Sequence, residues 1–156
     1  MIDLFDVWKT YPNGSHALQG VNLTIKHGEF VYLVGPSGAG KSTLIKLMYR
    51  EEKPTKGQIF FDGFNLSRIK EREIPKIRRK IGVVFQDFKL LHRLTVYENV
   101  SFALEVVDTP KSRIKKRVEQ VLDQVQLLHK KERYPSELSG GEQQRVSLAR
   151  ALANKP

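Results

Sequence analysis

The chain has 156 residues, of which 40% are hydrophobic and 28% are charged, as in an ordinary globular protein with one sizeable core. It contains no cysteine, which excludes a disulfide framework and a thiolate metal site. The N-terminal residues lack the basic start and apolar run of a signal peptide, and no apolar stretch approaches the roughly 18 residues of a membrane span. These features predict a cytoplasmic protein.

The net charge is +10, from 27 Lys and Arg residues against 17 Asp and Glu residues. Such an excess fits either a nucleic-acid or anionic membrane surface, or a solvated surface with a few phosphate-facing groups. The two basic clusters, 78–80 and 111–117, contain no interleaved aromatic residues of the kind that stack on bases. The charge pattern therefore disfavours a nucleic-acid binder and leaves a membrane-proximal role open.

The first half of the chain predicts strands around one helix. Residues 2–8 and 21–25 are strand-like and are joined by a turn-rich loop, so they predict an antiparallel pair. Residues 30–34, FVYLV, form a wholly apolar run that predicts a strand buried on both faces. Residues 43–50 predict a helix, and residues 58–63 predict a strand that ends in an Asp-Gly turn.

The second half predicts mainly helices. Residues 73–80 predict a short helix interrupted near Pro75, and residues 81–85, IGVVF, predict another buried strand. Residues 111–131 predict an amphipathic helix whose apolar stripe is Ile114, Val118, Val121, Leu122, Val125 and Leu128. A last helix is expected to begin near Ser139. Strands that are followed by helices favour an α/β fold with a mostly parallel sheet, to which the first strands add an antiparallel annex.

Residues 35–42, GPSGAGKS, match the phosphate-binding pattern G-x-x-x-x-G-K-[ST] between a predicted strand and a predicted helix. The glycines let successive backbone N–H groups curl around one anion, and the helix adds its positive N-terminal end. Lys41 supplies a mobile positive charge, and the Ser42 hydroxyl is an oxygen ligand for Mg²⁺. This pattern in this context predicts a site for a Mg²⁺-nucleoside triphosphate.

A second glycine-rich helix start lies at residues 138–145, LSGGEQQR. Taken alone, Ser139 is better explained as an N-cap than as a ligand-binding residue, because serine is a common cap. The same stretch also fits an anion site, since a small hydroxyl and free backbone meet at a helix N-terminus. The residues by themselves leave both interpretations open.

The phosphate-binding loop, Gln86 directly after the predicted strand 81–85, and LSGGEQQR follow one another in the order of the ABC-transporter ATPase family. The chain resembles that family over its whole length. The resemblance implies a P-loop NTPase fold of ABC type with an N-terminal antiparallel β annex and a helical subdomain. The resemblance also implies a division of the chain into three parts. Residues 1–80 and 81–86 form the nucleotide-binding core together with the β annex, residues 87–138 form the helical subdomain, and residues 139–153 form the signature helix.

The roles of individual residues follow from the same resemblance. It implies that ATP is the nucleotide, that Ser42 and Gln86 contact Mg²⁺, and that Lys41 and Gln86 serve hydrolysis. Tyr11 stands where the family places an aromatic residue that stacks on adenine, although without the resemblance it would be interpreted as a turn residue. The nucleotide-binding residues that we expect are Tyr11, Gly35, Ser37, Gly38, Ala39, Gly40, Lys41, Ser42, Thr43, Ser139, Gly140 and Gly141.

The resemblance also implies two protein partners. In this family, residues 139–141 close over the ATP of a second copy, so we expect an ATP-dependent homodimer. Residues 74–91, IPKIRRKIGVVFQDFKLL, and 95–106, TVYENVSFALEV, are most similar to the cell-division branch of the family. The ATPase of that branch works with the membrane protein FtsX, at the cytoplasmic side of the cell membrane. Residues 87–91 are expected to border the groove that receives this partner.

The sequence stops at Pro156, before the position at which the family has a Walker B strand ending in Asp-Glu and, further on, a switch histidine. We therefore expect these residues to be part of a longer protein, to leave apolar surface uncovered, and to hydrolyse ATP little or not at all alone. The histidines that are present do not follow the signature helix and lack metal-ligand spacing: His16, His27, His92 and His129.

Two other functions stay open at this point. The chain also resembles the ATPases of lipoprotein-release and macrolide-export transporters, which share the three motifs but are less similar between Gln86 and Leu91. The other alternative is a nucleotide-binding module without turnover.

Overall fold

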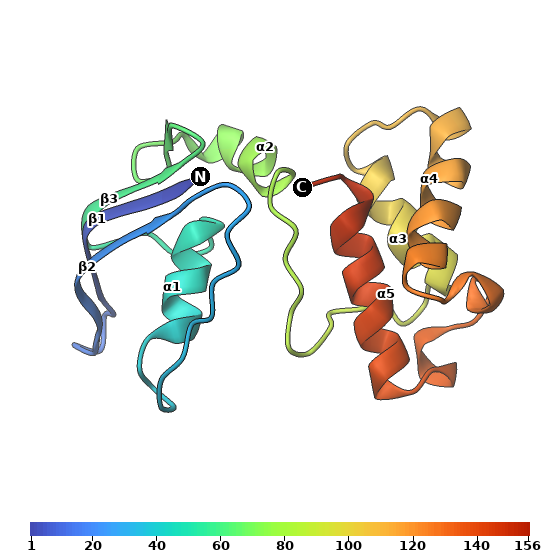
Figure 1. Ribbon diagram of the computed structural model, residues 1–156, viewed down its shortest axis with the longest axis horizontal. Coiled ribbons are helices and arrows are strands. Elements are labelled where there is room, and N and C mark those ends of the chain that lie inside the picture. The colour runs from blue at the N-terminus through green and yellow to red at the C-terminus, as the bar shows by residue number, and fades with distance from the viewer. The chain divides into compact units, whose positions relative to one another are not determined.

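The computed structural model describes all 156 residues, which form two compact units, Met1–Arg78 and Arg79–Pro156. In Figure 1 the first unit runs from blue to green and contains every strand, whereas the second, from green to red, is helical. No helix in either unit is long and apolar enough to cross a membrane.

The first unit contains one four-stranded antiparallel sheet with the order β2-β1-β3-β4. Its strands are β1 (Ile2–Thr10), β2 (His16–Ile25), β3 (Lys56–Phe61) and β4 (Phe64–Asn65). Leu4 of β1 pairs with Leu23 on one side and with Ile59 on the other. Leu4, Val7 and Ile59 are almost completely buried. The sheet therefore has one face toward the core of this unit. An irregularity in the pairing with β2 between Leu4 and Val7 breaks the strict alternation, so that both side chains are buried although they lie three residues apart.

The hairpin between β3 and β4 turns at Asp62 and Gly63, which confirms the predicted Asp-Gly turn. Both residues have a positive φ, 47° and 80°, as the two central residues of a type I′ turn require. Glycine adopts this conformation without steric cost, and aspartate tolerates it. The antiparallel pair predicted for residues 2–8 and 21–25 is also confirmed as β1 and β2, which are longer than predicted.

Two helices complete the first unit. α1 (Lys41–Met48) contacts β2 and β3 and buries Thr43, Leu44 and Leu47. The 3-10 turn η1 (Glu71–Glu73) leads into α2 (Ile74–Arg78). Both helices lie within two residues of the predicted bounds. The structure thus confirms that the glycine-rich loop leads into a helix.

Two of the predicted strands are not formed. The apolar runs 30–34 and 81–85 are irregular and belong to no sheet. Phe30 and Val34 are 80% and 82% exposed, so apolar surface lies uncovered here, as expected. A strand buried on both faces depends on partner strands along both edges, and an apolar run carries no information about whether those partners are in place. The prediction of strands in these two segments is therefore wrong for this structure, and its only sheet is antiparallel.

The second unit is built from three helices, each of which contacts the other two (Figure 1). They are α3 (Val96–Glu105), α4 (Lys111–Gln124) and α5 (Gly140–Ala153). The 3-10 turns η2 (Leu128–Lys130) and η3 (Pro135–Glu137) lie between α4 and α5. The completely buried core residues are Val96, Val100, Val118, Val121, Leu122, Leu127, Val146 and Ala149. The amphipathic stripe predicted on α4 thus faces this core.

Arg117 of α4 fixes the C-terminal end of α5. Its Nε donates to the carbonyl of Ala153 at 2.9 Å, and its Nη2 donates to the carbonyl of Leu152 at 2.6 Å. The last carbonyls of a helix have no donor within that helix. One guanidinium therefore satisfies two of them and holds α5 against α4.

The sequence predicted a helical subdomain in this region but not α3 as a separate helix. A local signal for α3 is present at Thr95 and Glu98. The Thr95 N–H donates to Glu98 Oε2 at 2.7 Å, and the Glu98 N–H donates to Thr95 Oγ1 at 3.2 Å. This is a capping box, which marks the start of a helix. The helix predicted for residues 111–131 ends at Gln124, seven residues early.

Candidate functional site

The glycine-rich loop leads directly into α1, and its path depends on glycine. Gly38 and Gly40 have φ angles of 79° and 86°, in the left-handed region that favours glycine. A Cβ on Gly40 would lie 2.3 Å from the carbonyl oxygen of Ala17 and 2.9 Å from Leu18 Cδ2. The end of the loop therefore approaches β2 so closely that only glycine fits.

Several hydrogen-bond donors converge at the start of α1. Gly40 is its N-cap residue, and no side chain caps the helix. The first N–H groups of α1 and the positive end of its dipole are therefore left for an external acceptor. Lys41 lies back over the loop, because its Nζ donates to the carbonyls of Gly35 and Pro36 at 2.7 and 2.6 Å. Residues 35–39, which include Ser37 and Ala39, are exposed. This arrangement can bind an anion.

The structure brings Tyr11 to the same end of α1. The Tyr11 hydroxyl lies 3.2 Å from Thr43 Oγ1, and Thr43 is buried. Lys9 Nζ lies 5.0 Å from the centroid of the Tyr11 ring, within range of a cation–π contact. The predicted nucleotide-binding residues of the first unit, Tyr11 and residues 35–43, thus form one group.

The protein offers few oxygen ligands for a metal ion at this loop. No group of three or more His, Cys, Asp or Glu side chains is placed to hold a metal. The Ser42 hydroxyl, on the exposed second residue of α1, is the predicted ligand. This fits Mg²⁺, because that ion usually takes only one or two ligands from the protein and the rest from water and substrate phosphates.

The second predicted anion site lies at the start of α5, in the second unit. Ser139 is the N-cap residue and forms a capping box with Glu142. Glu142 Oε2 accepts from the Ser139 N–H at 2.9 Å and from the Ser139 hydroxyl at 3.0 Å. Gly140 and Gly141 are exposed, and a Cβ on Gly140 would meet nothing within 4 Å. The structure thus confirms Ser139 as a cap, while the first N–H groups of α5 stay accessible to an anion.

Glu142 is held in its ionised form. Hydrogen bonds from the Lys130 side chain, first of all, and from Ser139 lower the pKa of Glu142 to about 2, against a usual value of 4.5. The carboxylate therefore carries a full negative charge near neutral pH and completes the cap. An anion at the start of α5 has to bind beside this charge.

Gln86 is exposed and forms a turn with Asp87, in which the Phe88 N–H donates to the Phe85 carbonyl at 3.1 Å. The next two residues, Phe88 and Lys89, have positive φ. Two residues that the sequence did not single out hold this segment: Arg150 of α5 and Asn99 of α3. The signal in the sequence is weak. Each is a polar residue among the apolar residues of its helix, and no local pattern shows which backbone it contacts.

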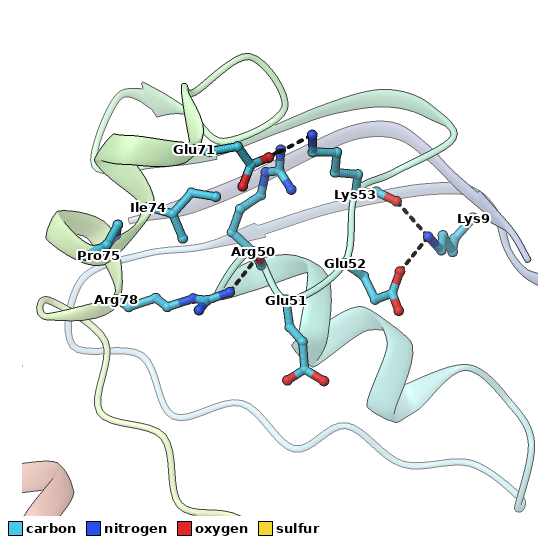
Figure 2. A pocket seen from close by; sticks show the side chains of 9 residues that line it. All are labelled: Lys9, Arg50, Glu51, Glu52, Lys53, Glu71, Ile74, Pro75 and Arg78. Carbon is cyan, nitrogen blue, oxygen red and sulfur yellow. Dashed lines mark hydrogen bonds and ion pairs between the residues drawn. The ribbon is translucent and has the colours of Figure 1, made fainter.

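A cavity of about 500 Å³ lies at the other end of α1 (Figure 2). Both of its lysines form ion pairs with carboxylates of the lining: Lys9 with Glu52 at 2.7 Å and Lys53 with Glu71 at 2.8 Å. Its remaining lining residues are Arg50, Glu51, Ile74, Pro75 and Arg78.

The buried Arg50 donates to the Leu66 carbonyl at 2.8 Å, and burial lowers the pKa of its guanidinium. The eight residues of α1, about 12 Å at 1.5 Å per residue, separate most of this cavity from the loop, and only Lys9, which contacts the Tyr11 ring, is near both. We therefore place the candidate nucleotide site at the loop and not in this cavity.

Comparison with known proteins identifies the family. Residues 18–156 match the family model described as ABC transporter. The chain belongs to the ABC transporter family. All 156 residues align at 65% identity with the cell division ATP-binding protein FtsE of Bacillus subtilis and cover 68% of that protein. They align at 48% identity with the methionine import ATP-binding protein MetN of Helicobacter pylori and cover 48% of it.

A solved ABC transporter cassette has the same fold. It is a dimeric ATP-binding cassette in a post-hydrolysis state with bound ADP and Pi, and it matches with a TM-score of 0.89 at 42% identity. The match covers 100% of this chain and 71% of the cassette. The α/β fold of ABC type predicted from the sequence is thus confirmed. As a member of the ABC transporter family, the chain is an ATP-binding protein of the ATPase class.

Proposed function

We propose that this chain is the ATP-binding subunit of an ABC-type membrane complex that acts in cell division with an FtsX-like membrane protein. The observation that carries the proposal is the 65% identity to a cell division ATP-binding protein across all 156 residues. The subunit would be peripheral on the cytoplasmic side of the cell membrane. Its nucleotide-binding core and β annex would occupy residues 1–86, its helical subdomain residues 87–138, and its signature helix residues 139–153.

In this proposal the first unit holds the phosphates and the base of ATP. The N–H groups of the loop, the start of α1 and the Lys41 ammonium would bind the phosphates, and Tyr11 would stack on the adenine. Support comes from the uncapped start of α1 and from the bond between Tyr11 and Thr43. Ser42 and Gln86 would hold Mg²⁺, which supplies positive charge against the phosphate oxygens.

The start of α5 would bind the ATP that is held by the phosphate-binding loop of a second copy of the chain. Support comes from the accessible N–H groups at Gly140 and Gly141 and from the dimeric state of the related cassette with ADP and Pi. ATP carries negative charge that both half-sites can bind, so it would favour a head-to-tail dimer. Hydrolysis would then remove the bridge between the two copies.

Binding of a fluorescent ATP analogue to the chain tests the nucleotide site. We expect Lys41→Ala to weaken binding by about 10- to 100-fold, because a charge-assisted contact to phosphate is lost. The matched control is Lys46→Ala on the same helix, whose ammonium lies 3.3 Å from Glu51 instead. Equal loss of affinity in both variants would show that only the overall charge matters.

Co-purification with an FtsX-like membrane protein tests the partner. Leu91 is 38% exposed, whereas Phe88 packs against the helical core, so Leu91→Glu is the cleaner variant. We expect Leu91→Glu to abolish co-purification. Val106→Glu, at a 55% exposed residue directly after α3, is the matched control and should retain it. Retention of the partner by Leu91→Glu would contradict the proposed groove.

We also infer that these 156 residues alone bind ATP with little or no turnover. They contain no Asp-Glu pair after an apolar strand to polarise the attacking water. The full-length gene product should hydrolyse ATP, and Lys41→Ala should stop it. ATP hydrolysis by the 156-residue chain that also depends on Lys41 would contradict this inference.

The second candidate function is the ATPase subunit of a solute transporter. The 48% identity to a methionine import ATP-binding protein favours it, and a lipoprotein-release or macrolide-export transporter is the form that the sequence suggested. The co-purification experiment separates the candidates, because a transporter subunit would bind its own membrane partner and not the FtsX-like protein.

A further inference from the structure

The segment after Gln86 contains two residues in an unfavourable left-handed conformation. Phe88 and Lys89 are consecutive and have φ angles of 54° and 46°. For residues with a Cβ this left-handed conformation is costly, and it persists only where surrounding contacts enforce it. This left-handed pair therefore requires partners that hold it.

Arg150 of α5 is such a partner. Its Nη2 donates to the carbonyl of Phe88, and its Nη1 donates to the carbonyl of Lys89, each at 2.7 Å. One guanidinium thus holds the carbonyls of both left-handed residues. Burial lowers the pKa of Arg150, and no carboxylate lies within ion-pair distance of it. The planar fork of arginine can reach two carbonyls at once, which a lysine ammonium on a single stem does less well.

The other end of the segment is held by the buried Asn99 of α3. The Leu91 N–H donates to Asn99 Oδ1 at 2.8 Å. Asn99 Nδ2 lies 2.9–3.0 Å from the carbonyl oxygens of Leu91, Leu94 and Thr95. Residues 88–91 are therefore fixed at one end to α5 and at the other to α3, and Gln86 lies just outside the fixed part.

We propose that Arg150 is a positioning residue that makes the Gln86 loop move together with the signature helix. This inference rests on the proposed function, in which the start of α5 binds a partner's nucleotide and Gln86 serves hydrolysis. Arg150 lies eleven residues after Ser139, or about 16 Å along a helix at 1.5 Å per residue. A rigid helix carries a displacement of one end to the other. Closure at Ser139 is thus transmitted through Arg150 to the backbone next to Gln86.

Amide hydrogen exchange in the nucleotide-free protein tests the clamp without ATP hydrolysis. We expect Arg150→Met to speed exchange of residues 87–90 by about tenfold or more, the effect of losing a charge-assisted hydrogen bond. Arg150→Lys should give a smaller increase. Lys89→Gly in the Arg150→Met background should restore part of the protection, because glycine favours the left-handed turn. Arg113→Met, at an exposed residue of α4, is the matched control and should leave these amides unchanged.

ATP turnover by the full-length gene product tests the positioning role. We expect Arg150→Met to lower kcat about tenfold. This is less than the loss of about 100-fold that a catalytic group misplaced by 1 Å can cause. KM for ATP should stay within about twofold, because the loop and Lys41 belong to the first unit and are not altered. Arg150→Lys should recover part of kcat, and Arg113→Met should match the wild type. A variant that merely unfolds would lose kcat and protection throughout the second unit.

The outcomes separate this inference from the proposed function. If the wild-type protein hydrolyses ATP and Arg150→Met changes neither kcat nor exchange at residues 87–90, the inference is overturned. If exchange rises but kcat does not fall, Arg150 holds the turn only as part of the fold, and the positioning role is overturned. If the wild-type protein has no ATPase activity, the proposed function fails and the positioning role fails with it, while exchange still shows whether the clamp exists.

Discussion

The starts of α1 and α5 are both glycine-rich and both are candidate phosphate sites, yet they are built in opposite ways. α1 has no side-chain cap, and its N-cap Gly40 is left-handed. α5 has a complete capping box formed by Ser139 and Glu142, and Glu142 also forms an ion pair with Lys130. The first helix end thus leaves its donors to an external acceptor, whereas the second is stabilised by its own side chains.

The glycines differ in the same way. Gly40 is required by the conformation, because any Cβ would collide with the backbone of Ala17. Gly140 has helical geometry and open space where a Cβ would stand. Glycine is therefore structural at the first site, and at the second it only leaves the N–H groups accessible. The same substitution in the two places should have opposite effects on stability.

The largest effect is expected for Gly40→Ala. The left-handed backbone and the collision with Ala17 together should lower the free energy of unfolding of the first unit by about 2–4 kcal/mol. Urea unfolding followed by the fluorescence of Trp8, the single tryptophan, measures it. Gly38→Ala is the control, because its φ is 79° but no atom lies within 4 Å of its Cβ position. It should cost only about 1 kcal/mol. Equal losses would show that the contact with Ala17 is unimportant.

Ser139→Ala should have the next largest effect. Loss of the N-cap should lower the free energy of unfolding of the second unit by about 1 kcal/mol. Circular dichroism at the helix band during urea unfolding measures it, since the helices of this unit dominate that signal. Ser136→Ala, at an exposed serine in η3, should be neutral. A neutral Ser139→Ala would mean that the cap contributes nothing to stability.

Gly140→Ala should have a small effect of the opposite sign. Alanine favours the helix over glycine, so the second unit should gain about 0.5 kcal/mol. The added Cβ should at the same time weaken ATP-dependent pairing of the full-length gene product, which size-exclusion chromatography with ATP measures. Stabilisation with unchanged pairing would contradict a role for this helix end in binding nucleotide.

The smallest effect is expected from pH. The folded-state pKa of Glu142, about 2, lies below the usual 4.5 because of Lys130 and Ser139. The contribution of Glu142 to stability is therefore fully present above about pH 4.5 and is lost as the pH falls from 4.5 toward 2. Acid titration of the folded fraction should be shallower in Glu142→Gln than in the wild type. Identical titration curves would show that this carboxylate is not coupled to folding.

Local patterns predicted one part of the molecule well. The antiparallel strand pair, the Asp-Gly turn and the apolar stripe of α4 each depend on neighbours in the sequence, and all three are confirmed. The order of the three motifs also sufficed to identify the family. These features could be predicted because the sequence itself contains the period or the spacing that produces them.

Non-local contacts could not be predicted. The apolar runs 30–34 and 81–85 would form strands only beside partner strands, and in this structure they pair with none. The role of Arg150 depends on the carbonyl of Phe88, 62 residues earlier in the chain. Asn99 is a polar residue on an apolar helix face, and its role depends on the hydrogen bond that it accepts from the Leu91 N–H, which the sequence does not reveal. Contacts of this kind leave no period in the sequence.

The two bonds of Lys41 to the carbonyls of Gly35 and Pro36 have a calorimetric consequence. A phosphate that binds to Lys41 replaces these acceptors, so the exchange conserves part of the hydrogen bonding instead of adding to it. The heat that comes from Lys41 is then the difference between two sets of ammonium hydrogen bonds. Lys41 should therefore contribute less to the binding enthalpy that a titration calorimeter records than a lysine without these two acceptors would.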